Sequence, residues 1–269
     1  MIQTTWVELA NIPRMTWADG RPLEPFTPFE LTQRLRIRPE GSTAEAHWPF
    51  PYSLQLAPGP GGVMVNGLEL GVGALVPVGG VHPGNPMVVR VLASPKESAG
   101  WPSGLARPPA PWSDETLSVL ADQLLELGHI VGQRFLQRDE KADASWLPAL
   151  AGVWPQRTVI GWRRGVVESL SIATAAGFEV GKTLALQAVC APMQRLVIRC
   201  APEGDPIGMI SGLIAGGGLP CLETFRCEVD PQRKPEELRT LPGLSTAFPV
   251  LKVLEVVPDP MPVLRMPVG

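Results

Sequence analysis

Four short segments in the second half of the chain share one pattern of apolar residues. The first, fourth and sixth positions of each are apolar, and the segments begin at Val167, Met193, Leu222 and Leu251, which lie 26, 29 and 29 residues apart. Such alternation is typical of a strand with one buried face. The stretches between them can hold a turn and a helix, and the candidate helices span residues 183–189, 206–215 and 235–241. The pattern predicts repeated strand–helix units, with the strands side by side in a parallel sheet backed by the helices.

Residues 1–93 have a different pattern, in which short apolar segments are separated by Pro and Gly clusters. The candidate strands span residues 31–38, 52–56, 63–65, 74–78 and 87–92. This spacing is typical of an all-β unit, and the Asn66-Gly67 pair suits a tight turn between two strands. We therefore expect an all-β, sandwich-like domain over residues 1–93.

A Pro-rich stretch separates the two patterns. Residues 94–112 contain five prolines and no apolar periodicity, so we expect a linker there. Trp101 and Trp112 lie within it, and these large side chains could dock the two parts of the chain together.

A helical segment is predicted after the linker. Ser113 suits the N-cap of a helix that ends near Gly128, with Trp112 and Leu117 placed as a hydrophobic staple. A second helix is expected over residues 129–139. Residues 113–269 should therefore form this helical segment followed by the α/β domain with parallel strands.

Two features of this region resemble known families. The L-x-x-L-x-L pattern and its period resemble leucine-rich repeats, although the Asn or Cys expected after each strand is missing. Residues 117–140, LSVLADQLLELGHIVGQRFLQRDE, with residues 161–172, GWRRGVVESLSI, look like the short helical companion domain that precedes degenerate leucine-rich repeats in myxobacterial and planctomycete proteins. The two resemblances cover about residues 113–257. They imply a short solenoid that acts as a recognition scaffold, without catalytic residues.

The charge and composition exclude several classes of partner. Lys and Arg number 23 against 26 Asp and Glu, so no general basic field exists to bind nucleic acid. No apolar run approaches the length of a membrane span, and no signal peptide is recognisable, so we expect a cytoplasmic protein without a membrane partner. The four cysteines have no zinc-binding spacing and should be reduced, buried thiols.

The motifs of catalysis are incomplete. Residues 177–183, GFEVGKT, resemble a phosphate-binding loop, but three residues rather than four separate Gly177 from Gly181. Ser245 lacks the second glycine of a nucleophile elbow, and Cys227 has no neighbouring base and should be a small hydrophobe. Metal-ligand spacing is also missing from the three histidines, His47, His82 and His129. His129 is better interpreted as a cation at a helix end. We expect no enzyme activity, cofactor or metal.

The strand prediction also defines a candidate binding surface. Residues between the inward positions should form three rows on the opposite face of the sheet. The rows are Ser169, Arg195, Thr224 and Val253; Ser171, Val197, Arg226 and Glu255; and Ala173, Arg199, Glu228 and Val257. Arg195, Arg199 and Arg226 would form a basic cluster flanked by Glu228 and Glu255, and arginine binds carboxylates through two parallel hydrogen bonds. The alternative is that these residues are ordinary cross-strand ion pairs.

The sequence therefore favours a non-catalytic scaffold that binds an extended peptide or an acidic protein segment. The bound surface would be the repeat face, alone or with the groove against the β domain. The two-part architecture resembles the peptide-binding accessory proteins of ribosomal natural-product pathways such as crocagin formation, which implies a precursor peptide and its modifying enzymes as partners. The alternatives are a structural protein that self-associates through its repeats, as a homodimer for example, and a cryptic enzyme that uses scattered carboxylates.

Overall fold

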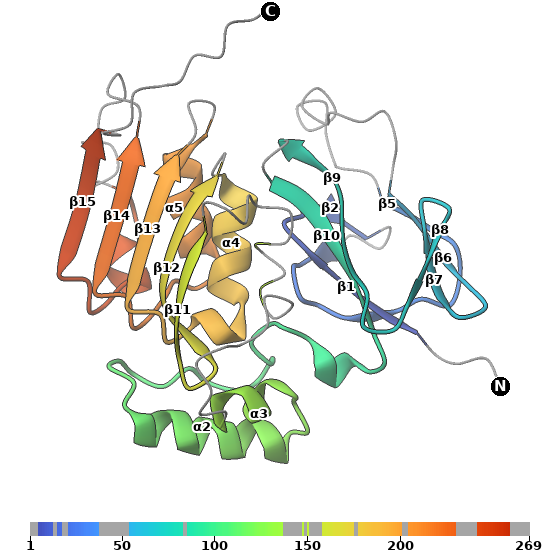
Figure 1. Ribbon diagram of the computed structural model, residues 1–269, viewed down its shortest axis with the longest axis horizontal. Helices are drawn as coiled ribbons and strands as arrows, with labels where there is room; N and C mark the ends of the chain where they lie inside the picture. The colour runs from blue at the N-terminus through green and yellow to red at the C-terminus, as the bar shows by residue number, and fades with distance from the viewer. Residues whose placement is uncertain are drawn as a thin grey trace, which may run out of the picture.

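The computed structural model describes residues 5–12, 15–17, 21–37, 54–82, 85–136, 147, 150, 158–174, 177–200, 204–229 and 241–258. The fold is of mixed α/β content, with antiparallel sheets in the N-terminal part and a sheet with parallel strands in the C-terminal part (Figure 1). The expected class is confirmed at this level. Among the described helices, none has the length and apolar character needed to cross a membrane.

The N-terminal part contains two four-stranded antiparallel sheets. One has the order β4 (Phe29–Glu30), β1 (Trp6–Ala10), β10 (Asn85–Leu92), β9 (Leu75–His82), and the other β5 (Leu35–Ile37), β6 (Leu54–Pro58), β7 (Gly62–Val65), β8 (Leu68–Gly71). Strands β2 (Met15–Thr16) and β3 (Pro22–Leu23) pair as a two-stranded antiparallel ribbon. Residues of both larger sheets, such as Val7 and Leu56, share one hydrophobic cluster. The predicted turn at Asn66 and Gly67 is present, with positive φ at both residues.

The sequence prediction missed β1, whose central residue is a charged one. Glu8 is buried in the middle of this strand, and Arg90 of β10 forms an ion pair with it at 2.9 Å. Arg90, which offsets the cost of burying this carboxylate, lies 82 residues away, so no local sequence pattern indicates the pair.

The C-terminal sheet has the order β11 (Val159–Arg163), β12 (Val166–Thr174), β13 (Arg195–Cys200), β14 (Thr224–Val229), β15 (Val253–Pro258). Strands β12 to β15 are parallel, and β11 forms an antiparallel hairpin with β12. The register aligns each of the three predicted rows residue by residue, so the side-by-side arrangement is confirmed. Strands β13, β14 and β15 begin two residues after the first apolar position of each segment, since Met193, Leu222 and Leu251 precede them.

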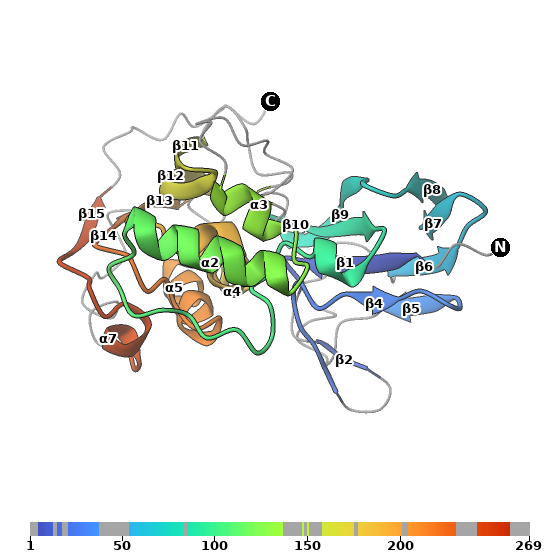
Figure 2. The ribbon, with the colours of Figure 1, turned by 90° about the horizontal axis from the view of Figure 1, so that it is seen from below.

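Helices cover one face of this sheet, as Figures 1 and 2 show. They are α4 (Phe178–Leu186), the short η5 (Ala188–Cys190), α5 (Pro206–Ala215) and α7 (Leu244–Ala247). Inward residues of the strands, such as Leu196, Ile198 and Phe225, join the helices in one hydrophobic cluster. The prediction for α5 is confirmed, whereas α4 begins five residues before the predicted start at 183. Residues 235–240 of the third predicted helix lie outside the described residues.

Helices α4 and α5 pack with their backbones in close approach. A Cβ on Gly181 of α4 would overlap the carbonyl oxygen of Met209, and one on Gly212 of α5 would overlap the carbonyl oxygen of Phe178. The GFEVGKT stretch therefore lies within and just before a packed helix, and its second glycine permits helix contact.

The segment between the two parts is packed against both of them. Its short helix η1 (Pro95–Glu97) leads to Ala99, whose N–H lies 3.3 Å from both carboxylate oxygens of Glu8. On the other side, the N–H of Trp101 donates to the carbonyl of Leu186 at 2.9 Å, and the carbonyl of Ala99 accepts from Ala188 at 3.0 Å. Burial raises the pKa of Glu8, and the charge of Arg90 opposes this shift.

Both linker tryptophans belong to the C-terminal core rather than to the β core. Trp112 is buried there, and Trp101 packs against it with ring centroids 5.8 Å apart. Arg107 lies 5.6 Å from the Trp101 ring and donates to the carbonyls of Ala185 at 2.7 Å and Gly218 at 3.0 Å. Its charge therefore stabilises the C-terminal ends of α4 and α5.

The predicted helical segment is present below the sheet in Figure 1 as α2 (Asp114–Glu126) and α3 (Val131–Leu136). Ser113 caps α2, since its side chain accepts a hydrogen bond from the N–H of Thr116 at 3.1 Å. Gly128 follows the helix with φ of +71°. Residues 137–139 of the second predicted helix lie outside the described residues.

We predict that Gly181→Ala lowers the free energy of unfolding by about 3 kcal/mol, because the added methyl group forces α4 away from α5. Chemical denaturation monitored by circular dichroism measures this change. Gly71→Ala is the matched control, since nothing lies within 4 Å of its Cβ position, and its effect should stay within about 0.5 kcal/mol. Equal stability of the two variants would contradict the close packing.

Candidate functional site

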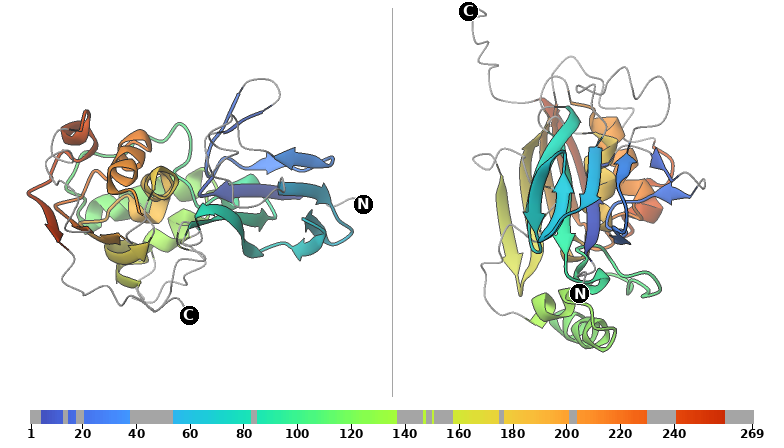
Figure 3. Two further views of the ribbon diagram at one scale, coloured as in Figure 1. Left: turned by 90° about the horizontal axis from the view of Figure 1, so that it is seen from above. Right: turned by 90° about the vertical axis from the view of Figure 1, so that its right-hand side faces the viewer.

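The candidate surface is the outer face of the parallel sheet, which we define as the face opposite α4 and α5. The five residues expected to form the binding site all lie on it, because their positions alternate with the buried inward residues of β13, β14 and β15. Figure 3 shows this sheet from two further directions. The side chains differ in exposure: that of Glu228 is 6% exposed and that of Glu255 is 48% exposed.

Four of the five residues form a linked charge cluster. Nε of Arg199 lies 2.9 Å from Oε2 of Glu228, and Nε of Arg226 lies 3.1 Å from Oε1 of the same carboxylate. Nη1 of Arg226 lies 3.6 Å from Glu255. We call Arg199, Arg226, Glu228 and Glu255 the Arg–Glu cluster. The ion pairs that the sequence left as an alternative are therefore present.

Arg195 is exposed and stands apart from this cluster. It pairs in register with Ser169 and Thr224, and it makes no ion pair with any residue that the structure describes. The structure thus brings together four of the predicted site residues and leaves Arg195 as a separate positive charge on the same face.

The outer face is less open than the sequence predicted. Ala173, Val197 and Glu228 are buried, although their positions face away from the helices. Val197 has arginines two residues before and after it on β13 and Arg226 beside it on β14, and the aliphatic stems of such side chains cover small neighbours. The face therefore has an apolar centre with arginine side chains around it.

The charges of the Arg–Glu cluster balance, since it contains two arginines and two glutamates. Arg195 adds one positive charge to the five candidate residues. Glu228 accepts hydrogen bonds from both Nε atoms, and the terminal Nη groups of Arg199 have no hydrogen-bond partner among the described residues. Guanidinium groups held in this way suit carboxylates, which accept two parallel hydrogen bonds.

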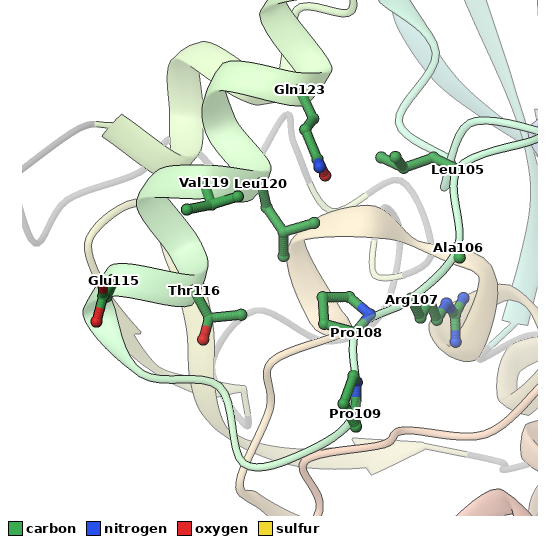
Figure 4. Close-up of a pocket in the computed structure, with 10 residues that line it drawn as sticks. All are labelled: Leu105, Ala106, Arg107, Pro108, Pro109, Glu115, Thr116, Val119, Leu120 and Gln123. Carbon is green, nitrogen blue, oxygen red and sulfur yellow. The ribbon is translucent and has the colours of Figure 1, made fainter.

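A concave site, which the sequence prediction missed, lies between the Pro-rich segment and α2 (Figure 4). It has a volume of about 570 Å³. The lining residues are Leu105, Ala106, Arg107, Pro108, Pro109, Glu115, Thr116, Val119, Leu120 and Gln123. The available signal was Val119, an apolar residue outside the buried stripe of α2 that remains 53% exposed. We call this site the linker groove.

The buried thiols of Cys190 and Cys221 are poor nucleophiles. Burial raises the pKa of Cys190 far above its usual range and that of Cys221 to about 11. Cys200 and Cys227 are buried in the core with their sulfur atoms 3.7 Å apart. Within the described ranges, no group of three or more His, Cys, Asp or Glu could hold a metal ion.

The interpretation of His129 as a helix-end cation is wrong. His129 lies between α2 and α3 along the chain. Its side chain is buried, and burial lowers its pKa to about 4, so it is neutral at neutral pH. The ammonium group of Lys96 lies near this helix end instead, 2.6 Å from the Cβ position of Gly128. Of the other histidines, His47 lies outside the described residues and His82 ends β9.

Comparisons with protein-family models, with curated protein sequences and with solved structures find no match for this chain. The likeness to leucine-rich repeats and to their helical companion domain therefore stays a resemblance of pattern.

We predict that His129 makes the protein less stable in acid. Its folded pKa of about 4 lies below the ordinary value of 6.5, so the unfolded chain binds the proton first as the pH falls. The contribution of neutral His129 to the stability of the fold is therefore complete above pH 6.5 and is lost as the pH falls toward 4. The lowered pKa corresponds to about 3 kcal/mol for a fully buried group, and partial contact with solvent reduces this loss of stability to about 2 kcal/mol.

Urea denaturation of the protein and of His129→Gln between these pH values measures the effect. Glu8 titrates in both proteins, so its opposite contribution cancels in the difference. A difference in stability that does not change with pH would show that His129 is not held neutral.

Proposed function

We propose that this protein is a cytoplasmic, non-catalytic scaffold that binds an acidic, extended peptide segment on the outer face of its parallel sheet. Arg195, Arg199 and Arg226 supply the binding charges. Its strand–helix units act as a short leucine-rich-repeat-like solenoid, which offers a stiff, preformed surface. A precursor peptide of a ribosomal natural-product pathway, presented to its modifying enzymes, would be a ligand of this kind.

The observation that carries the proposal is the position of Glu228. This carboxylate is almost fully buried and accepts hydrogen bonds from the Nε atoms of Arg199 and Arg226. A buried acid that orients two half-exposed guanidinium groups reduces the ordering cost of binding a further carboxylate. An ordinary surface ion pair has no need of a buried partner.

The spacing of the charges suits an extended ligand. Neighbouring strands lie about 4.8 Å apart, and residues two apart on one strand lie about 7 Å apart. Arg195 and Arg199 are four residues apart on β13, with Val197 between them. An extended peptide with alternating acidic residues can therefore place two of its carboxylates opposite these two arginines.

The exchange of ion pairs makes binding feasible. Arg226 is 36% exposed and Glu255 is 48% exposed, and the contact between them is 3.6 Å long. Exposed pairs of this kind contribute at most about 1 kcal/mol. A ligand carboxylate can therefore replace Glu255 at little cost.

We predict that Arg199→Gln combined with Arg226→Gln weakens binding of an acidic peptide at least about tenfold. The probe is a fluorescein-labelled peptide in which glutamate alternates with serine, and fluorescence anisotropy measures its affinity. Arg195→Gln should also weaken binding, because its charge faces the same ligand.

Arg36→Gln is the matched control, since Arg36 is an exposed arginine on β5 of the other part of the chain. It should leave affinity unchanged, and thermal denaturation checks that every variant is folded. Binding that survives replacement of all three outer-face arginines would reject the proposal.

A further inference from the structure

The linker groove has the form of a docking site for an apolar segment. Its floor is Leu120, which is only 2% exposed. One wall is the extended stretch of Leu105, Pro108 and Pro109, and the other is the face of α2 with Val119 and Gln123 (Figure 4). Most of the groove is therefore lined by aliphatic side chains and proline rings.

The extended wall offers few hydrogen bonds to a ligand. Pro108 and Pro109 have no backbone N–H. The carbonyl of Leu105 accepts from Nε1 of Trp101 at 2.6 Å, and the carbonyl of Pro108 accepts from Nε1 of Trp112 at 3.0 Å. The side of the groove formed by this stretch thus selects its occupant by apolar contact.

Both walls are held in place before any ligand arrives. Arg107 fastens the extended wall to the carbonyls of Ala185 and Gly218, and α2 is capped by Ser113. A preformed groove spares the ordering cost that a mobile one adds to binding.

Arg107 of the lining donates to backbone carbonyls, whereas the exposed charge along α2 is negative. Glu115, Asp122 and Glu126 are exposed on α2 at spacings of seven and four residues, which place them on one face of the helix together with Val119. The sequence of α2 contains no Lys or Arg. None of these three carboxylates forms an ion pair with a residue in the described part of the chain.

We propose that the linker groove binds a short segment of a partner protein whose aliphatic side chains are flanked by lysine or arginine. The aliphatic side chains fill the groove over Leu120, and the basic side chains meet the carboxylates of α2. This site differs from the outer face in location and in the sign of its charge, so it does not depend on the proposed function.

The test uses the whole 269-residue chain and two fluorescein-labelled peptides with the same Leu-Val-Leu-Ala stretch, one flanked by lysines and the other by glutamates. The lysine peptide is expected to bind saturably in fluorescence anisotropy, and the glutamate peptide at least about tenfold more weakly. Equal affinity of the two peptides, or no saturable binding of the lysine peptide, would overturn the proposal.

Two variants locate the binding. Val119→Asp should weaken the lysine peptide at least about tenfold, although it adds a negative charge, because it removes the apolar contact. Glu115→Lys should weaken the lysine peptide and strengthen the glutamate peptide. Both residues are exposed, so the fold should persist, as circular dichroism checks.

Leu68→Asp is the matched control, because Leu68 is 60% exposed on β8, in the N-terminal part. It changes apolar area and charge as Val119→Asp does and should leave the affinity unchanged. If Leu68→Asp and Val119→Asp have the same effect, the peptide binds by general charge and the groove is not its site. The acidic-peptide experiment at the outer face is unaffected by either result.

Discussion

The parallel hydrogen-bonded ladder from β12 to β15 is the constraint on which the rest of the C-terminal part depends. Its register aligns Leu170, Leu196, Phe225 and Leu254 toward the helices. The same register aligns the charged rows on the opposite face. A slip of one residue would move the apolar column outward and the arginines into the core. The cost of burying those charges keeps the core and the charged surface in one arrangement.

Two buried carboxylates have related roles in the molecule. Glu8 is held by Arg90 and by the N–H of Ala99, so it joins the N-terminal sheet to the start of the Pro-rich segment. Glu228 is held by two arginines and joins two strands on the outer face. In each case the desolvation of the acid is offset by charge-assisted hydrogen bonds, so removing one partner would leave an uncompensated buried charge.

The Pro-rich segment shows which properties a local sequence pattern predicts and which it does not. Its prolines indicate a stretch without regular structure, and apart from one short helix this holds. They do not indicate that the segment is tied to both parts of the chain. Arg107 reaches the carbonyl of Gly218, which lies 111 residues further on. Contacts of this length create one wall of the linker groove, so Val119 could mark an apolar position outside the buried stripe of α2 but could not indicate a groove.

The sequence by itself determined the strand rows, the span of α5 and the cap at Ser113, because each depends on a period or a residue type that acts within a few positions. It also placed the five candidate residues on one face. Only the tertiary structure decided that Glu228 is buried between two arginines, that Arg195 stands apart, and that His129 is a buried neutral side chain. These properties depend on which distant side chains exclude water from a group, and burial of that kind arises only when separate elements pack together.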